Sequence, residues 1–196
     1  MKEEKMQIEN TLTKLSEANE LFSSRVKLRR FSFDDINDLF EYASDDLVTE
    51  YLTWPSYTSL NHIQEVIEQY YLSKPGVWAI ELIEEKKCIG AIDLRISEEH
   101  DKGSFGYVLN RNYWNKGYMT EALQAVIDFG FDVLQLNRID ATHYVGNEGS
   151  GKVMEKCNMK YEGIGLQEVK IKGVYRDVVH YAILRHDWLK KKKKKL

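Results

Sequence analysis

The stretch from Phe105 to Leu134 constrains the fold of this chain more than any other part of the sequence. It opens with a short apolar and aromatic run, residues 105–109, of the kind that forms a buried strand. A polar loop occupies residues 110–117. From Met119 onward the apolar residues recur at i, i+3, i+4 and i+7, which lines one face of an amphipathic helix. The stretch therefore predicts a strand, a tight loop and a long helix.

The start of this helix has the properties of an anion-binding site. The first turn of a helix has unpaired backbone N–H groups and the positive end of the helix dipole, so phosphate is its natural ligand. Gly117 lets a ligand approach the backbone closely and permits positive φ. Lys116 contributes a charge and Thr120 a hydroxyl. The loop lacks the GxxxxGK(S/T) and GxGxxG patterns of the commonest nucleotide-binding loops, and an ordinary connection is the alternative.

The loop and the first helical turn resemble the acetyl-CoA signature of the GNAT superfamily of N-acetyltransferases. Residues 112–122 read NYWNKGYMTEA. They resemble the pattern Q/R-x-x-G-x-G/A, and also the Y-W-G-K-G-Y-A-T-E-A form that is frequent in the ribosomal-protein N-acetyltransferase branch. Asn112 replaces the leading Gln or Arg, and Asn115 replaces the first glycine. Asn is the non-glycine residue that best tolerates left-handed geometry, so the loop can survive the second change.

A second segment, residues 147–163, resembles the family's N-x-x-S…V-x-x-K-x-G-F-x-x-E-G segment. Asn158 stands where glycine normally ends the helix, and Asn is an acceptable left-handed cap. Two motifs at the right separation are more specific than either alone. The resemblance covers roughly residues 25–189.

The resemblance implies an α/β (α+β) GNAT fold. Its sheet is mixed but mostly antiparallel, has about seven strands, splays in the middle and is flanked by about four helices. Apolar patterns in the chain predict strands at residues 26–31, 77–83, 88–96, 104–109, 138–145, 166–171 and 177–184. They predict helices at residues 34–43, 59–71 with Ser59 as N-cap, from Met119, and 150–157. The final hairpin would turn at Lys172-Gly173.

We expect one acetyltransferase domain, residues 25–189, with a helical extension before it, residues 1–24, and a lysine tail after it, residues 190–196. Apolar residues in the extension recur at near-helical spacing: Ile8, Leu12, Leu15 and Phe22. A homodimer contact or a flap over the site is one interpretation, and a helix packed on its own domain is the favoured one. The run of six lysines, Lys190 to Lys195, predicts a solvated, frayed end.

By the same resemblance, acetyl-CoA binds where the strand meets the loop and the helix. That strand usually carries a bulge in the family, and the main-chain groups of Tyr107, Val108 and Leu109 would bind pantetheine and the thioester carbonyl. A backbone N–H there would stabilise the oxyanion of the tetrahedral intermediate. The implied cofactor-binding residues are Tyr107, Val108, Leu109, Asn115, Lys116, Gly117, Tyr118, Met119, Thr120, Asn147, Ser150 and Lys156. No metal is implied.

Acetyl transfer needs a group that stabilises the departing thiolate. Many family members use a tyrosine in the helix after the Asn, but in this chain that place falls near Met154, which cannot donate a proton. Ser150, three residues after Asn147, resembles the serine of the ribosomal-protein branch and could hydrogen-bond the thiolate. Its alternative role is the N-cap of the same helix.

The reaction also needs a base that accepts the proton of the amine. Glu168 lies within one residue of the position where the ribosomal-protein branch places a carboxylate, and burial could raise its pKa. A shift of one residue along a strand reverses the face of the side chain, so the register decides this assignment. Other strand residues could take the role instead: Asp93, Glu81 and His143.

The leading hypothesis is acetylation of a protein N-terminal α-amine, as in the ribosomal-protein branch. A small amine such as a polyamine or an aminoglycoside is the enzyme alternative, because Asp45, Asp46 and Glu50 lie near an aromatic loop, residues 50–57. By resemblance this loop covers the acceptor pocket, although Trp54 could equally be core. A non-catalytic acyl-CoA-binding module is the third possibility.

Composition excludes other classes. A net charge of −3 and a pI near 6.0 provide no general attraction for nucleic acid. No apolar run reaches membrane-spanning length and no signal peptide precedes the domain, so no membrane partner is expected. Two cysteines, Cys88 and Cys157, are far apart in the sequence, which fits reduced thiols and a cytoplasmic protein.

Overall fold

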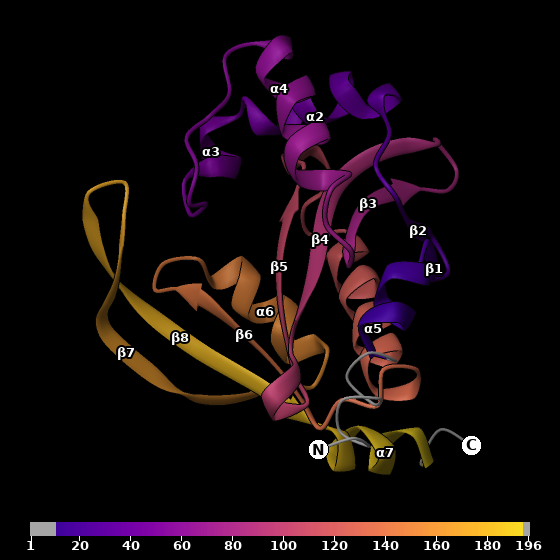
Figure 1. The fold of residues 1–196 in the computed structure, drawn as a ribbon. Helices are drawn as coiled ribbons and strands as arrows, with labels where there is room; N and C mark the ends of the chain where they lie inside the picture. The colour runs from indigo at the N-terminus through magenta and orange to yellow at the C-terminus, as the bar shows by residue number, and fades with distance from the viewer. Residues whose placement is uncertain (1–10, 194–196) are drawn as a thin grey trace.

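The computed structural model describes residues 11–193. In this part of the chain the strands form one eight-stranded sheet with the order β1-β2-β3-β4-β5-β6-β8-β7 (Figure 1). The strands are β1 (Glu20–Phe22), β2 (Val26–Arg29), β3 (Val77–Leu82), β4 (Lys87–Ser97), β5 (Lys102–Leu109), β6 (Arg138–Tyr144), β7 (Lys160–Ile171) and β8 (Val174–Leu184). The sheet is mixed and mostly antiparallel, as predicted. The strand beyond the expected seven is β1.

The sheet opens between β5 and β6, which is the splay that the family resemblance implied. These strands are parallel and pair only where residues 102–104 meet residues 138–140. Beyond that point β5 stays paired with β4, and β6 stays paired with β8 (Figure 1). The expected bulge in β5 is wrong, because its register on β4 is unbroken; a register shift lies instead between β3 and β4, at Ile80/Glu81. Early loss of parallel pairing therefore frees the backbone of β5.

Helices cover both faces of the sheet. They are α2 (Ile36–Ala43), α3 (Asp46–Thr49), α4 (Leu60–Val66), α5 (Tyr118–Asp132), α6 (Glu148–Lys156) and α7 (Arg185–Lys193), with short helices η1 (Phe33–Asp35), η2 (Ile67–Tyr71), η3 (Glu98–His100) and η4 (Arg111–Tyr113). Residues 11–17 are also helical. Among the described residues, no helix is long and apolar enough to cross a membrane.

Alternation along β3 separates two hydrophobic cores. Trp78 and Ile80 belong to the core beneath α5, whereas Val77 and Ala79 belong to the core beneath α2 and α4. All four side chains are buried. Because strand residues point alternately to opposite faces, one strand anchors both layers of helices. In Figure 1, α5 lies along one side of the sheet and α2 and α4 lie together at the top.

Most predicted elements form, with shifted ends. Ser59 caps α4 as predicted, since its side chain accepts a hydrogen bond from the His62 amide at 3.2 Å. The helix then continues as the π-helical segment η2. The last hairpin turns at Lys172-Gly173, where both residues have positive φ, but its first strand begins at Lys160, earlier than predicted.

The described part of the N-terminal extension, residues 11–24, packs on its own domain, although it is not helical throughout. Leu15 is buried in the core beneath α5, and the Trp78 indole donates to the Ala18 carbonyl at 2.7 Å. Phe22, which the helical pattern included, lies exposed on β1. Ile8 falls outside the described residues.

The expectation of a frayed lysine tail is wrong for Lys190 to Lys193, which continue α7. Lys192 forms an ion pair with Asp132 at 2.6 Å, and its ammonium lies 4.8 Å from the centre of the Trp188 ring. These tertiary contacts extend the helix beyond the point where the sequence alone suggested an end. Residues 194–196 are outside the described part of the chain.

Candidate active site

The loop between β5 and α5 is held in place by polar contacts that centre on the buried Asn110. Asn110 is buried, and its Oδ1 accepts the Asn112 amide at 3.0 Å. The Asn110 Nδ2 donates to Glu41 of α2 at 2.9 Å, and Asn112 donates to the same carboxylate at 3.2 Å. Hydrogen bonds lower the pKa of Glu41: the one from Lys87 has the largest effect and the one from Asn110 the next largest. A charged carboxylate therefore fixes the start of the loop.

The loop adopts the left-handed geometry that its residue types predicted. Asn115 has φ 60° and Gly117, the N-cap residue of α5, has φ 86°. Within the described part of the chain no side chain caps this helix end. The first backbone N–H groups of α5 are consequently available to an anion, as expected for a phosphate-binding loop.

Arg25 ties the loop to the first turn of α5, a contact that sequence reasoning missed. Its guanidinium donates to the Lys116 carbonyl at 2.9 Å and to Glu121 at 2.6 Å. Glu121 also accepts hydrogen bonds from Ser23 and Ser24. Burial opposes ionisation of Glu121, but the bonds from Arg25 and the two serines outweigh it and lower the pKa. An acidic residue in the first turn was the only sequence signal for this clamp.

A cavity of about 420 Å³, here called the loop cavity, lies against this loop and the start of α6. It is lined by most of the predicted cofactor-binding residues: Tyr107, Val108, Leu109, Asn115, Gly117, Met119, Thr120, Asn147, Ser150 and Lys156. Lys116 and Tyr118 are not part of its lining. The Tyr118 ring packs instead under the Arg25 guanidinium, 4.4 Å from its centre. Lys152, which was not predicted, adds a second cation beside Lys156.

The backbone of β5 faces this cavity with alternate N–H groups. Asn110 N donates to the Ile89 carbonyl on β4 at 2.8 Å. Amides two residues apart on a strand point the same way, so the Val108 amide also faces β4. The amides of Tyr107 and Leu109 therefore point toward the opening between β5 and β6. Two of the three predicted residues thus direct donors into the opening.

A second cavity of about 550 Å³, here called the aromatic cavity, lies beside the first. Its aromatic lining comes from the loop after α3, from η2 and from β5 and β6: Tyr51, Trp54, Tyr57, Tyr70, Tyr71, Phe105, Tyr107 and Tyr144. Trp54 and Tyr57 stack with ring centres 4.7 Å apart. The predicted aromatic loop, residues 50–57, therefore forms one wall, and Trp54 also packs against the core beneath α2 and α4.

Asp93 is the only carboxylate that lines the aromatic cavity in the described structure. Its Oδ1 accepts the Gly106 amide at 2.7 Å, and an Arg95 nitrogen lies 3.6 Å from its Oδ2. Burial raises the pKa of the Asp93 carboxyl, although Arg95 and the Gly106 amide oppose this shift. The side chain is only 15% exposed. Asp93 is thus a carboxylate with raised basicity at the wall of a cavity.

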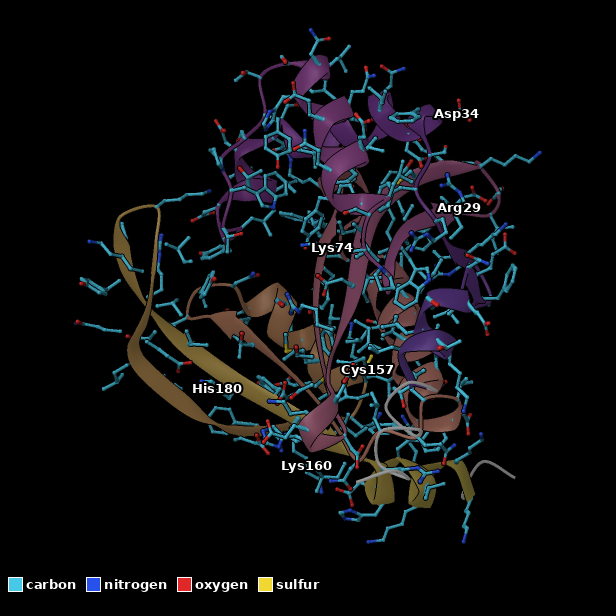
Figure 2. All side chains as sticks on the ribbon, in the orientation of Figure 1. Arg29, Asp34, Lys74, Cys157, Lys160 and His180 are labelled. Atoms are coloured by element: carbon cyan, nitrogen blue, oxygen red, sulfur yellow. The ribbon has the colours of Figure 1, made fainter. Side chains whose placement is uncertain are left out.

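The other candidate bases occupy different surroundings. Glu168 lines neither cavity; its carboxylate contacts His180 at 2.7 Å on the β7–β8 hairpin, where Figure 2 labels His180. Glu81 is paired with Arg29 at 2.5 Å and also lies outside both cavities. His143 lines the aromatic cavity, with Nδ1 3.0 Å from the Tyr144 carbonyl.

The acidic residues near the aromatic loop do not gather in the aromatic cavity. Asp45 pairs with Arg111 at 2.7 Å, and Asp46 accepts a hydrogen bond from Ser56. Glu50 lines the loop cavity instead. The acidic cluster that a polyamine pocket would require is therefore not formed by these three residues.

The two cavities meet at a shared set of residues: Tyr51, Leu52, Tyr107, Val108, Asn147 and Ser150. Ser150 lies in the first turn of α6 and is not its N-cap, so that alternative is wrong. Asn147 is the N-cap, with its side chain accepting the Ser150 amide at 3.4 Å. The Ser150 hydroxyl is 2.8 Å from the Tyr107 hydroxyl. Two hydroxyls therefore stand at the junction.

Known proteins are similar to this chain in sequence and in fold. Residues 25–160 match the Acetyltransferase (GNAT) domain. An uncharacterised N-acetyltransferase of Bacillus licheniformis, p20, is 32% identical over 86% of this chain and 97% of its own. Spermidine N(1)-acetyltransferase of Escherichia coli (strain K12) is 24% identical over 84% of this chain and 88% of its own. The crystal structure of a GNAT-family acetyltransferase from Bacillus anthracis has a TM-score of 0.79 at 30% identity, covering 85% of this chain and 99% of that one.

Proposed function

The chain belongs to the GNAT acetyltransferase family, and from that premise we propose that it acetylates the α-amine of a protein N-terminus with acetyl-CoA. Its acetyl-CoA-dependent N-acetyltransferase activity follows from the family. The observation that carries the proposal is the junction of two cavities at Tyr107 and Ser150. One cavity has the features of a phosphate site, and the other has a single, half-buried carboxylate among the described residues. A thioester and an amine that enter from opposite sides would meet there.

The residues of the loop cavity fit coenzyme A. Left-handed Asn115 and Gly117 leave the amides at the start of α5 open for a pyrophosphate, and Lys152 and Lys156 supply positive charge. When bound, acetyl-CoA supplies the activated acetyl group. The amides of Tyr107 and Leu109 would donate to the thioester oxygen as negative charge develops on it.

In this proposal Asp93 takes the role of base that the sequence suggested for Glu168. A carboxylate whose pKa is raised accepts a proton more readily than an ordinary one, and Asp93 lies where an amine would enter. Asp93, directly or through a water, would remove the proton of the ammonium before attack. The Ser150 hydroxyl would donate a hydrogen bond to the departing thiolate, which is the role that its place at the junction supports.

The lining of the aromatic cavity favours an N-terminal α-amine over a polyamine. A polyamine carries several positive charges and requires several carboxylates. Among the described residues Asp93 is the only carboxylate that lines this cavity, and Arg95 adds a positive charge to it. A single ammonium followed by an uncharged peptide chain suits one carboxylate surrounded by aromatic rings. The ribosomal-protein form of the loop motif points to the same acceptor class.

An amine panel tests this proposal. Purified protein would be assayed for thiol release from acetyl-CoA with short peptides that have a free N-terminus, with the same peptides blocked at the N-terminus, and with spermidine. We expect turnover with the free peptides, none with the blocked peptides and at least about tenfold lower kcat/KM with spermidine. A preference for spermidine would overturn the acceptor assignment.

A further inference from the structure

We propose that the Tyr107 hydroxyl is a positioning group that directs the Ser150 hydroxyl toward the departing thiolate. This inference rests on the proposed function, because it requires acetyl transfer at the junction of the two cavities. It assigns a role to the side chain of a residue from which the sequence predicted only main-chain contacts.

The hydroxyl of Tyr107 lies between two oxygens of Ser150. It is 2.8 Å from the Ser150 Oγ and donates to the Ser150 carbonyl oxygen at 3.0 Å. Tyr107 belongs to β5 and Ser150 to α6, so these contacts bridge the opening where β5 and β6 separate. Both residues line both cavities. The two hydroxyls therefore lie where the acetyl group would pass from the thioester sulfur to the amine nitrogen.

The geometry allows two arrangements of the hydroxyl hydrogens. If Tyr107 donates to the Ser150 carbonyl, the Ser150 hydrogen can point back to the Tyr107 oxygen. If Tyr107 donates to the Ser150 Oγ instead, the Ser150 hydrogen is free to point into the junction. A thiolate at the junction favours the second arrangement, because it accepts that hydrogen. No proton is transferred in this step; only the directions of the hydrogen bonds change.

Burial keeps the Tyr107 phenol protonated, so it remains a hydrogen-bond donor during the reaction. Burial raises the pKa of the Tyr107 phenol well above its ordinary value, although the hydrogen bond with Ser150 opposes the shift. The phenol therefore stays protonated at neutral pH, which suits a positioning group and not a proton source.

Packing alone does not explain the Tyr107 hydroxyl. The Tyr107 ring stacks on Phe105 with centres 5.8 Å apart, and this contact needs no oxygen. Helix capping does not explain the Ser150 hydroxyl either, because Asn147 caps α6. The Tyr107 hydroxyl thus has only Ser150 oxygens as its described partners, the carbonyl and the hydroxyl, at a site shared by both cavities.

A double-mutant cycle tests the inference. Tyr107→Phe keeps the ring and removes the hydroxyl, and Ser150→Ala removes the group that it would orient. With saturating acetyl-CoA and peptide, we expect Ser150→Ala to lower kcat about 10-fold to 1,000-fold and Tyr107→Phe to lower it about 3-fold to 30-fold. The double variant should be no slower than Ser150→Ala, since Tyr107 acts only through Ser150. The Kd of CoA should change less than about threefold in each.

Tyr42→Phe is the matched control. Tyr42 is a buried tyrosine whose hydroxyl has no hydrogen-bond partner in the described structure, and it lines neither cavity. Its replacement should leave kcat and the Kd of CoA unchanged. Ser150→Thr keeps a hydroxyl and should remain sensitive to Tyr107→Phe. Circular dichroism and thermal melting would confirm that every variant is folded.

The possible outcomes distinguish a failure of this inference from a failure of the proposed function. Wild-type kcat in Tyr107→Phe, with a large loss in Ser150→Ala, would overturn the positioning role and leave the acetyltransferase proposal standing. Independent, multiplying losses in the double variant would overturn it as well, and so would a loss of CoA affinity that matches the loss of kcat. Absence of turnover by the wild type with every amine tested would overturn the proposed function and this inference together.

Discussion

The loop cavity and the aromatic cavity lie side by side but are built in opposite ways. The loop cavity is made largely from two short segments, β5 through the start of α5 and the start of α6, and its anion-binding character depends on the backbone amides at the start of α5. The aromatic cavity is made from side chains on α4, η2, β3, β4, β5, β6, α6 and the loop after α3. A site built from backbone depends on chain conformation, whereas a site built from side chains depends on their identity. Substitutions should therefore damage the two cavities by different routes.

The largest expected effect on cofactor binding comes from changing the backbone conformation at Gly117. A β-branched residue at φ 86° is strained, and its added carbon would lie 3.2 Å from the Arg25 guanidinium. We expect Gly117→Val to weaken CoA binding by about 100-fold or more, measured by isothermal titration calorimetry.

Gly173→Val provides the matched control for this change. Gly173 has nearly the same φ, 83°, at the hairpin turn, with open space around it. Its replacement should carry similar backbone strain and leave CoA affinity intact. Unchanged CoA affinity in a folded Gly117→Val protein would break the assignment of the loop cavity.

In the aromatic cavity the change of one side chain should act on turnover and spare the cofactor. We expect Asp93→Asn to lower kcat by about 100-fold to 10,000-fold, because the amide cannot accept the proton of the amine. CoA affinity should stay within about threefold. Glu168→Gln is the matched comparison, since that carboxylate contacts His180 outside both cavities and should cost little activity. The reverse ranking of the two variants would return the role of base to Glu168.

The same residue should show opposite effects on activity and on stability. Burial raises the pKa of Asp93 above the unfolded value of about 3.9, so the folded protein holds this proton more tightly than the unfolded chain. The charged form then destabilises the fold at neutral pH, and this cost disappears as pH falls through the raised pKa toward 3.9. We expect Asp93→Asn to resist urea better than wild type at pH 7, with a difference that shrinks toward pH 4. A less stable variant at pH 7 would contradict this.

The smallest effect is expected outside both cavities, at the lysine tail. Deleting residues 190–196 removes the Lys192–Asp132 ion pair, whose side chains are 51% and 45% exposed. Such a pair contributes about 1 kcal/mol or less, so the free energy of unfolding should fall only slightly. CoA affinity and turnover on a short peptide should not change at low or near-physiological salt. Loss of activity on the short peptide at both salts would place the tail in the active site.

The contrast between the cavities also explains what could be predicted from the sequence. The loop cavity is encoded locally: Asn115 and Gly117 indicate left-handed geometry by residue type alone, and both adopt it. Asp93 was only one of several candidates, because its place at the cavity wall depends on the register of β4 on β5. The contact of Arg25 with the loop could not be predicted, because Arg25 is far away in the sequence and reaches the loop only after folding.

Three other features were not predicted correctly, each for its own physical reason. Ser150 and Asn147 are both good helix caps, and Asn147 takes that position, which leaves the Ser150 hydroxyl free to meet Tyr107. The sequence predicted a frayed lysine run because Asp132, the ion-pair partner of Lys192, lies on α5, far away in the sequence. Strand β1 is three residues long, too short to show alternation.

Binding of a bisubstrate analogue tests the central claim most directly. In this analogue the sulfur of CoA is joined through an acetyl bridge to the α-nitrogen of a short peptide. We predict that it binds at least about tenfold tighter than CoA, because the peptide part would occupy the aromatic cavity while CoA holds it in place. Trp54→Ala should remove this gain without weakening CoA itself, and Gly117→Val should weaken both ligands. An analogue that binds no tighter than CoA, or a gain that Trp54→Ala leaves intact, would contradict the two-cavity account.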